Sequence, residues 1–438
     1  MNSFDVVVAG AGPSGMAAAA SASASGCRVC LIDDNAAAGG QIWRGFEGTT
    51  TSEEAGAGSY ARLKQSLLGS RVELRTGARV VAQLSSNVLR VESEIGCTDI
   101  GYQRLVLATG ARERFLPFPG WTLPGVMGAG GLQAMVKSGL PVNDKRVVIA
   151  GSGPLLLAVA DALTRHGARV FGIFEQAPVS RLIGFGAHLS AHPGKLWQGV
   201  QYRIATRSTP YRTRSWVTQA HGDGRLRAVT VSVNGSMRTI ECDYLGYGFH
   251  LIPNLELPRL LGCEIESGYV RVDSTQKTTV EGVFAVGEPT GVGGLDKALY
   301  EGQIAGLACA NRAATHLFAK RDRLIRFARA LDYAFTPCPE LSRLATPETL
   351  ICRCEDVPRR ALETKHNWRE AKLHTRCGMG PCQGRICGPA TEFLWGWDSE
   401  RVRPPIIPAR ISTVAAATEG ADSPLPEGPL SAHLQHES

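Results

Sequence analysis

The sequence lacks any long apolar run. No stretch approaches the roughly 20 apolar residues that a bilayer-spanning helix needs, and the nearest, residues 147–163, is interrupted by glycines, Pro154 and Asp161. The N-terminus also lacks the basic, apolar and small-residue regions of a secretion signal. We therefore expect no transmembrane segment and a cytoplasmic, reducing location, where a disulfide framework is disfavoured.

The sequence also has little excess charge of either sign. Its 47 Lys and Arg residues against 40 Asp and Glu give a net charge of +7 over 438 residues, which indicates no nucleic-acid partner. One basic cluster, residues 320–326, has acidic neighbours and helical spacing, so a solvated helix face is favoured, and a docking surface is the alternative. The length suffices for about three domains.

Five cysteines near the C-terminus are concentrated in two short segments. The first is Cys352-Arg-Cys354, and the second is Cys377-Gly-Met-Gly-Pro-Cys382-Gln-Gly-Arg-Ile-Cys387. A cluster of two irons takes four thiolates, and its bridging sulfides complete the coordination. Two segments that both supply thiolates therefore predict a 2Fe–2S cluster.

Zinc is the competing metal, because four thiolates also form a tetrahedral structural site. Zinc modules usually draw on Cys-x2–4-Cys pairs, whereas a single residue separates the first two cysteines here. The expected cluster ligands are Cys352, Cys354, Cys382 and Cys387. Cys377 is the reserve ligand, and His374 is the one candidate that could replace a cysteine as a ligand. The cysteines at 27, 30, 97, 242, 263, 309 and 338 are expected to be free.

The N-terminal region predicts a nucleotide-binding unit. Residues 4–9 form a short apolar strand that leads into Gly10-Ala-Gly12-Pro-Ser-Gly15 and an Ala-rich helix. The first glycine permits a tight turn, the second lets the backbone approach a pyrophosphate, and the third permits close helix–strand packing. A second strand ends at Asp33, whose carboxylate can accept hydrogen bonds from a ribose. The expected contacts of this unit are Gly10, Gly12, Pro13, Ser14, Gly15, Asp33 and Asp34.

A second unit of the same kind begins at residue 145, but its turn is altered. The strand leads into Gly151-Ser-Gly153-Pro-Leu-Leu156, and the following strand ends at Glu175. Leu156 replaces the third glycine and needs more room at the helix–strand contact. This favours a scaffold, or a nucleotide other than NAD, over a working NAD(P)H site. NAD(P) and ATP both stay open, with Gly151 and Gly153 as the expected contacts.

Two further segments resemble flavoprotein motifs. A buried strand ends in Ala-Thr109-Gly110, and a downstream strand ends in Gly287-Glu288-Pro. They are similar to the Ala-Thr-Gly and Gly-Asp motifs of two-dinucleotide-domain flavoprotein reductases, in which the acidic residue contacts the FAD ribityl chain. This resemblance implies that the first nucleotide is FAD, with Glu288 in place of the usual Asp.

The expected fold class is α/β, with two Rossmann-like dinucleotide-binding domains and a small helical C-terminal 2Fe–2S domain. The resemblance to two-dinucleotide-domain flavoproteins implies that the second domain is inserted between the two halves of the first. The expected bounds are 1–125 and 256–315 for the discontinuous FAD-binding domain, 126–255 for the inserted second nucleotide-binding domain, 316–345 for a linker, 346–412 for the 2Fe–2S domain and 413–438 for a disordered tail.

Three motifs narrow the resemblance. They are Gly39-Gly40-Gln41-Ile-Trp-Arg, the Gly246-Tyr-Gly-Phe249 segment with the following Pro-Asn, and the two cysteine segments. Together they resemble the α (A) subunits of bacterial multi-subunit flavin dehydrogenases over about residues 4–410. That family includes D-hydroxyproline dehydrogenase, opine oxidases and hydrogen cyanide synthase. The cysteine module also resembles the bacterioferritin-associated ferredoxin. Gly40 and Gln41 are further cofactor contacts under this resemblance.

The resemblance implies a division of labour between subunits. A β subunit with its own FAD would hold the amine-oxidising site, FMN would lie at the subunit interface, and a small ferredoxin-like γ subunit is a further implied partner. The complex would be cytoplasmic or peripheral to the inner membrane. Flavin suits such a relay because it exchanges one or two electrons.

No catalytic residue is expected in this chain, because it shows no constellation for amino-acid oxidation. The leading prediction is the electron-transfer α subunit of a dehydrogenase that oxidises an amino acid, an imino acid or an opine. The alternatives are a stand-alone NAD(P)H-dependent flavoprotein reductase that passes electrons to the cluster, and a non-catalytic iron–sulfur scaffold subunit.

Overall fold

The computed structural model describes residues 2–44, 56–398 and 402–416. Its first domain is built on a seven-stranded sheet of order β3-β2-β1-β6-β5-β4, with β19 paired to β6. The elements before the inserted domain are β1 (Asn2–Ala9), α1 (Pro13–Ala24), β2 (Val29–Ile32), α2 (Ala57–Leu68), β3 (Val72–Arg75), β4 (Ala78–Ser85), β5 (Val88–Ser93) and β6 (Gly96–Leu107). Those after it are α7 (Glu256–Leu260), β17 (Ile265–Glu266), β18 (Tyr269–Val270), β19 (Val283–Ala285), η1 (Glu288–Thr290) and α8 (Gly294–Cys309).

The two halves of this domain meet through very close packing of α1 on α8. A Cβ atom on Gly302 of α8 would lie 2.2 Å from the Ser14 carbonyl oxygen, and one on Gly306 would lie 2.4 Å from that of Ala18. The Ala-rich composition of α1 allows this approach. Downstream, β19 aligns in parallel with β6, so that Ala285 pairs with Leu107. Residues about 180 positions apart thus share one sheet.

The inserted domain has a parallel sheet of order β11-β10-β9-β15-β8 and a separate three-stranded antiparallel sheet, β12-β13-β14. The two-stranded pair β7 (Ala111–Glu113) and β16 (Leu251–Pro253) marks the two crossings between the domains. Its remaining elements are β8 (Val126–Gly128), α3 (Ala129–Lys137), β9 (Arg146–Ser152), α4 (Leu155–Arg165), β10 (Arg169–Glu175), α5 (Val179–Leu189), α6 (Pro193–Ala205), β11 (Tyr211–Arg212), β12 (Ser215–Asp223), β13 (Arg225–Val233), β14 (Ser236–Glu241) and β15 (Tyr244–Phe249).

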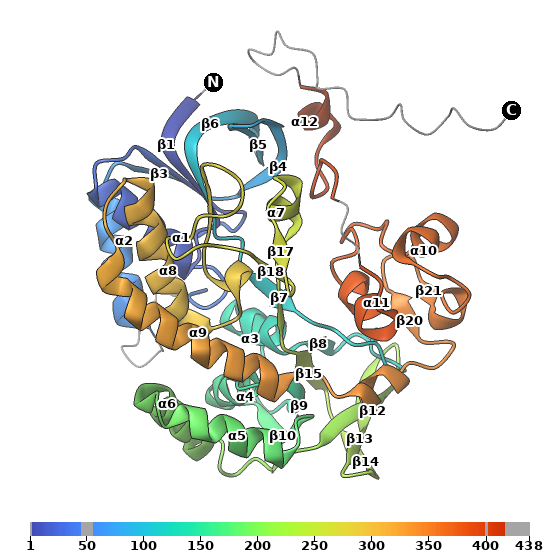
Figure 1. Cartoon of the computed structure of the whole chain (residues 1–438). Helices are drawn as coiled ribbons and strands as arrows, with labels where there is room; N and C mark the ends of the chain where they lie inside the picture. The colour runs from blue at the N-terminus through green and yellow to red at the C-terminus, as the bar shows by residue number, and fades with distance from the viewer. Residues whose placement is uncertain (1, 45–55, 399–401, 417–438) are drawn as a thin grey trace, which may run out of the picture.

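The segment 316–345 is a packed element of the fold, whereas the sequence suggested a linker. It forms α9 (Thr315–Phe335) and η2 (Pro339–Arg343), and α9 runs along both α8 and α5 (Figure 1). The helix buries an apolar stripe that includes Phe327 and Leu331. Within the basic cluster, Arg321 is buried and donates to the Ser274 carbonyl oxygen, so the expectation of a fully solvated face is wrong at that residue.

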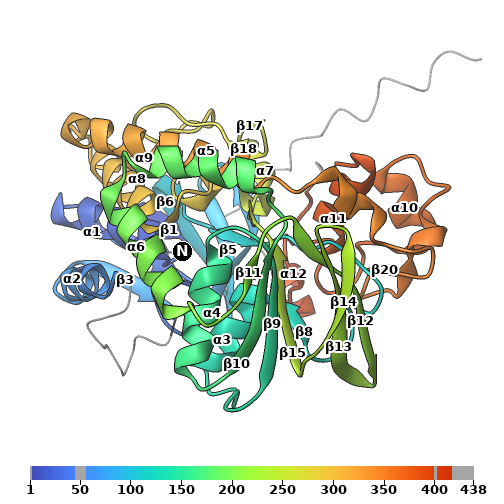
Figure 2. The same cartoon turned by 90° about the horizontal axis from the view of Figure 1, so that it is seen from below.

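The C-terminal module is small and mainly helical. Its elements are β20 (Leu350–Cys352), β21 (Val357–Pro358), η3 (Arg359–Ala361), α10 (Trp368–Thr375) and α11 (Cys387–Trp395). Figures 1 and 2 both show it beside the inserted domain, near β8 and β12. Ile386 and Phe393 pack against the core of that domain, and Trp121 Nε1 donates to the Leu350 carbonyl oxygen at 2.7 Å.

The chain then returns to the first domain. Ile406 N donates to the Val81 carbonyl oxygen, and a short helix, α12 (Ile411–Ala415), follows. Thr413 is buried, and its Oγ1 donates to Glu92. The expected disordered tail therefore begins too early, because residues 413–416 are held on β5, and residues 417–438 lie outside the described part. Among the described residues, none of the helices is long and apolar enough to cross a membrane.

Candidate functional site

The first glycine-rich turn joins β1 to α1, and its three glycines have different roles. Gly10 has φ +109°, and a Cβ there would lie 2.1 Å from the Ala108 carbonyl oxygen; one on Gly15 would lie 1.8 Å from that of Gly10. These two glycines are therefore required by the protein's own packing. Gly12 differs, because the nearest atom to its Cβ position is Gly40 Cα at 4.0 Å. Open space at this turn fits the approach of a phosphate to the N-terminus of α1, which begins at Pro13.

The two aspartates after β2 face different surroundings. Asp33 is buried, and its Oδ2 accepts from Ala11 N at 2.5 Å while its Oδ1 accepts from Asn35 N at 2.8 Å. Its carboxylate thus braces the glycine-rich turn from within. The neighbouring Asp34 is exposed, and its Oδ1 accepts from Asn35 Nδ2 at 3.1 Å.

The downstream turn at Gly287 lies against α1. A Cβ on Gly287 would be 2.6 Å from Ser14 Oγ. Glu288 accepts from Gly293 N and Gly294 N at 3.2 and 3.3 Å, and burial raises the pKa of its carboxyl group. The structure therefore brings the two predicted motifs together, with Glu288 bonded to its own loop.

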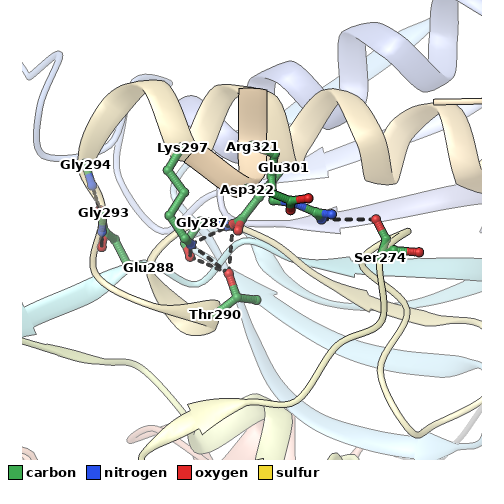
Figure 3. Close-up of polar contacts among 10 residues, drawn as sticks. All are labelled: Ser274, Gly287, Glu288, Thr290, Gly293, Gly294, Lys297, Glu301, Arg321 and Asp322. Carbon is green, nitrogen blue, oxygen red and sulfur yellow. Dashed lines mark hydrogen bonds and ion pairs between the residues drawn. The ribbon is translucent and has the colours of Figure 1, made fainter. Parts of the chain in front are cut away.

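A buried ion pair holds the Gly287 turn in place (Figure 3). Lys297 Nζ lies 2.9 Å from Glu301 Oε2, and the two side chains are 2% and 1% exposed. Lys297 also donates to the Gly287 carbonyl oxygen and to Thr290 Oγ1, while Glu301 accepts from Gly287 N and Thr290 Oγ1. This pair was not among the residues expected from the sequence, although the i, i+4 spacing of Lys and Glu in α8 is a visible signal.

The remaining predicted contacts of the first domain are arranged around the same turn. Gly40 has φ +61° and faces Gly12, with its Cβ position 3.0 Å from Gly12 Cα. Gln41 is exposed beside it. Thr109 Oγ1 donates to the Asn254 carbonyl oxygen, so the Ala-Thr-Gly segment is tied to the domain crossing, and Gly110 follows with φ +67°.

The second glycine-rich turn is covered by the chain itself. Gly153 N donates to Glu175 Oε2, and Ser152 Oγ donates to the Phe335 carbonyl oxygen at the end of α9. Gln176 Nε2 donates to Ser152 Oγ, and its Oε1 accepts from Cys338 N. Gly151 packs against the backbone of Gly248, and a Cβ on Gly151 would lie 1.9 Å from the Gly248 carbonyl oxygen. Residues 335–338 thus lie against the turn that a nucleotide would approach.

Two buried side chains, Glu175 and Leu156, belong to this second unit. Glu175 is fully buried, and burial raises the pKa of its carboxyl group to about 7. Leu156, at the position of the missing glycine, is buried in the apolar core between α4 and the sheet. The altered turn is therefore packed as a structural element.

The five C-terminal cysteines converge in space. The sulfur atoms of Cys352, Cys377 and Cys387 all lie within 4.8 Å of one another, and Cys354 contacts Cys382. Hydrogen bonds from Cys377 and Cys387 lower the pKa of the Cys352 thiol well below its ordinary value. His374 is exposed on α10 and is not among the described residues that form this group.

A cavity of about 290 Å³ opens beside these sulfurs. Its walls include all four expected ligands, Cys352, Cys354, Cys382 and Cys387. Cys377 is fully buried and is not among the lining residues. A set of four thiolates around one cavity matches the donors that a 2Fe–2S cluster requires. The opposite wall comes from the inserted domain and includes Phe115, Trp121, Met127 and Tyr247.

The sequence also contains a Cys-x-x-Cys spacing, Cys27-Arg-Val-Cys30, that the expectation of scattered free cysteines passed over. Both thiols are free. Cys30 is packed in the core on one face of the first sheet, and Cys27 packs against the core on the other. Because Cys27 precedes β2 and Cys30 lies within it, with their side chains in different cores, they do not form a redox pair.

Comparison with known proteins places this geometry in a family. The model of the family described as pyridine nucleotide-disulphide oxidoreductase matches residues 4–314. The chain belongs to this family. The match spans both glycine-rich turns and the Gly287 turn, and it ends before the cysteine module.

Relatives extend the likeness to the whole chain and confirm the resemblance to α (A) subunits. The HcnB subunit of hydrogen cyanide synthase from Pseudomonas aeruginosa is 31% identical, over 91% of this chain and 92% of its own. The opine oxidase A subunit of Rhizobium meliloti is 31% identical, over 96% of this chain and 100% of its own. The crystal structure of L-proline dehydrogenase from P. horikoshii has a TM-score of 0.70 at 18% identity, covers 94% of this chain and 80% of its own, and confirms the fold class.

Proposed function

We propose that this chain is the FAD- and 2Fe–2S-containing electron-transfer α subunit of a multi-subunit dehydrogenase. The observation that carries the proposal is the cavity lined by four cysteines in the same chain as an open dinucleotide turn. The C–N bond of an amino acid, an imino acid or an opine is oxidised on a partner β subunit. The names of the relatives, which are subunits of hydrogen cyanide synthase and of opine oxidase, support both the class of substrate and the assembly.

The residues of the first domain fit a dinucleotide. Gly12 leaves room for the pyrophosphate at the N-terminus of α1, and the exposed Asp34 can accept from a ribose. Glu288 and the Gly287 turn would lie beside the ribityl chain, where the Lys297–Glu301 pair fixes the backbone. FAD would supply the exchange of one or two electrons, and the protein's part is to bind and orient it.

The residues of the C-terminal module fit an iron–sulfur cluster, with Cys352, Cys354, Cys382 and Cys387 as ligands and Cys377 as the alternative to one of them. The cluster would supply one-electron transfer toward the acceptor. The walls of the cavity are apolar on the side of the inserted domain, which restricts the access of water.

The second nucleotide unit acts as a scaffold. Residues 335–338 cover its turn, and the Gly153 amide is already bound to Glu175. This disfavours the alternative of a stand-alone NAD(P)H reductase, and it makes neither NAD(P) nor ATP a required ligand. The β subunit with its own FAD, an FMN at the interface and a ferredoxin-like γ subunit belong to the proposal as partners, and the complex would be cytoplasmic or peripheral to the inner membrane.

The test is co-expression with a candidate β subunit, an amine-oxidising flavoprotein. The purified complex should contain flavin and two irons with two acid-labile sulfides per copy of this chain, and it should reduce an artificial acceptor with a secondary amine, amino acid or imino acid. Stoichiometric zinc without sulfide in anaerobically prepared protein would contradict the cluster.

Single-chain and variant controls separate the subunits' roles. The isolated chain should oxidise neither amino acids nor NADH. Cys382→Ser should slow the transfer of electrons to the acceptor, while substrate still reduces the partner's flavin, because these two steps occur on different polypeptides. Substrate turnover, or fast flavin reduction by NADH, in the isolated chain would place the active site here instead.

A further inference from the structure

The motif Gly246-Tyr247-Gly248 has no role in the proposed function so far. Tyr247 lies on β15 in the inserted domain, is 2% exposed, and is among the largest fully buried side chains of the described residues. Three phenylalanines hold its ring edge-on, with centroid distances of 5.4 Å to Phe115, 5.2 Å to Phe118 and 6.3 Å to Phe249. The position of the hydroxyl group is therefore fixed by the packing of the ring.

The Tyr247 hydroxyl has no hydrogen-bond partner within the part of the chain that the structure describes. A buried hydroxyl without a partner destabilises a protein, so such a group calls for an explanation. The nearby carboxylate of Glu113 is bound by the amides of Gly130 and Gly131 at the start of α3, at 2.9 and 3.0 Å. Glu113 does not accept a hydrogen bond from the Tyr247 hydroxyl in the structure.

The cavity beside the cysteines is where a hydrogen-bond partner for the Tyr247 hydroxyl can bind. Tyr247 lines this cavity together with Cys352, Cys354, Cys382 and Cys387. The hydrogen bond from Trp121 to Leu350 ties the inserted domain to the strand that ends at Cys352. The two walls of the cavity are thus fixed relative to each other, and anything bound by the cysteines lies beside the tyrosine.

We propose that the Tyr247 hydroxyl donates a hydrogen bond to a sulfur atom of the cluster held by these cysteines and thereby raises its reduction potential. The proposal rests on the proposed function. A phenol can donate one hydrogen bond, and hydrogen bonds to the sulfurs are among the factors that set the potential of such clusters. A donor stabilises the reduced cluster more than the oxidised one, because the reduced sulfurs carry more negative charge.

This assignment gives the inserted domain a function that does not need a nucleotide. Its glycine-rich turn is covered by residues 335–338, yet its strand β15 presents Tyr247 at the cavity. The domain would serve as the outer wall of the iron–sulfur site, and Tyr247 is a positioning residue that acts on the cluster without ligating iron.

The experiment compares Tyr247→Phe with Tyr244→Phe in the complex with the partner subunit. The first variant keeps the ring and removes only the hydroxyl oxygen. The second is the matched control, because Tyr244 begins the same strand but is not a lining residue of the cavity. Iron and sulfide contents are measured first, and the midpoint potential is then determined by titration followed by EPR.

Tyr247→Phe should shift the midpoint potential downward and change the g values of the reduced cluster, with unchanged iron and sulfide contents. Tyr244→Phe should reproduce the wild-type potential. An unchanged potential in Tyr247→Phe with an intact cluster would overturn the proposal. A wild-type complex without any cluster would instead overturn the proposed function on which it rests.

A second measurement applies to the wild type, in case the variant does not fold. Protein labelled with ring-deuterated tyrosine should show deuterium modulation in the pulsed EPR of the reduced cluster, because Tyr247 alone among the tyrosines lines the described cavity. Absence of modulation in protein with a full cluster would show that Tyr247 is not at the cluster and would also overturn the proposal.

Discussion

Removal of Lys297 tests whether the buried ion pair holds the Gly287 turn. The variant Lys297→Met keeps an unbranched side chain that is one atom shorter, and it removes three donated hydrogen bonds, to the Gly287 carbonyl oxygen, Thr290 Oγ1 and Glu301 Oε2, at 2.9 to 3.0 Å. It leaves the Glu301 carboxylate, which is 1% exposed, without its cation. Breaking a buried pair on one side costs about 3–5 kcal/mol.

The structure places this variant near the lower limit of that range. Glu301 keeps two donors, Gly287 N and Thr290 Oγ1, both at 2.8 Å. We expect Lys297→Met to lower the free energy of unfolding by about 3 kcal/mol. The double variant Lys297→Met/Glu301→Gln removes the uncompensated charge but keeps an acceptor for the Gly287 amide. It should be more stable than the single variant, because the hydrogen bonds of Lys297 are still missing but no uncompensated charge is left buried.

Urea unfolding followed by circular dichroism measures both free energies, and flavin retention on gel filtration reports on the turn. The single variant should release flavin more readily than the double variant. The expected loss of unfolding free energy in the single variant is about 3 kcal/mol. A loss below about 1 kcal/mol would refute the reasoning. A double variant less stable than the single one would refute it as well, because the destabilisation would then not come from an unpaired charge.

Three further predictions concern the two cofactor sites and the second nucleotide unit. Gly12→Val should fold, because the position is open, but should purify without flavin; flavin at wild-type content would show that the nucleotide does not approach this turn. Cys377→Ser should keep the reduced-cluster EPR signal and Cys354→Ser should lose it, and the opposite result would place Cys377 among the ligands. Glu175 has a pKa of about 7 against 4.5 in the unfolded chain, so the folded state binds the proton more tightly. Its contribution to stability should therefore fall by about 2 kcal/mol between about pH 5.5 and 8 relative to Glu175→Gln, and parallel pH profiles from urea unfolding would contradict this.

The local motifs were predictable from the sequence because each depends on a few neighbouring residues. The turns at Gly10 and Gly151 require backbone conformations that other residues rarely adopt, with φ of +109° and +139°. Their sequence pattern therefore reveals the strand–turn–helix units directly. The cysteine segments are equally local, since two thiolates in one short segment already restrict the metals that can bind.

The surroundings of individual residues within those motifs were not predictable, because they depend on the direction of a side chain. Asp33 and Asp34 are adjacent, and the sequence favoured the first as the ribose contact. In the structure Asp33 accepts from Ala11 N inside the turn, while Asp34 is exposed. Successive residues at the end of a strand point to opposite sides, so the two carboxylates have different surroundings.

Contacts between distant segments were decided by tertiary packing alone. The Phe335 carbonyl oxygen at the end of α9 accepts from Ser152 across 183 positions. Tyr247 lines the cavity of Cys352 and Cys387 because the C-terminal module packs on the inserted domain. Local sequence does not predict such long-range contacts, because they depend on which apolar faces bury each other. The sequence by itself therefore indicated where the nucleotide turns and the cysteine group lie along the chain, and packing decided that one nucleotide turn stays open, that the other is covered, and which side chain faces the cysteines.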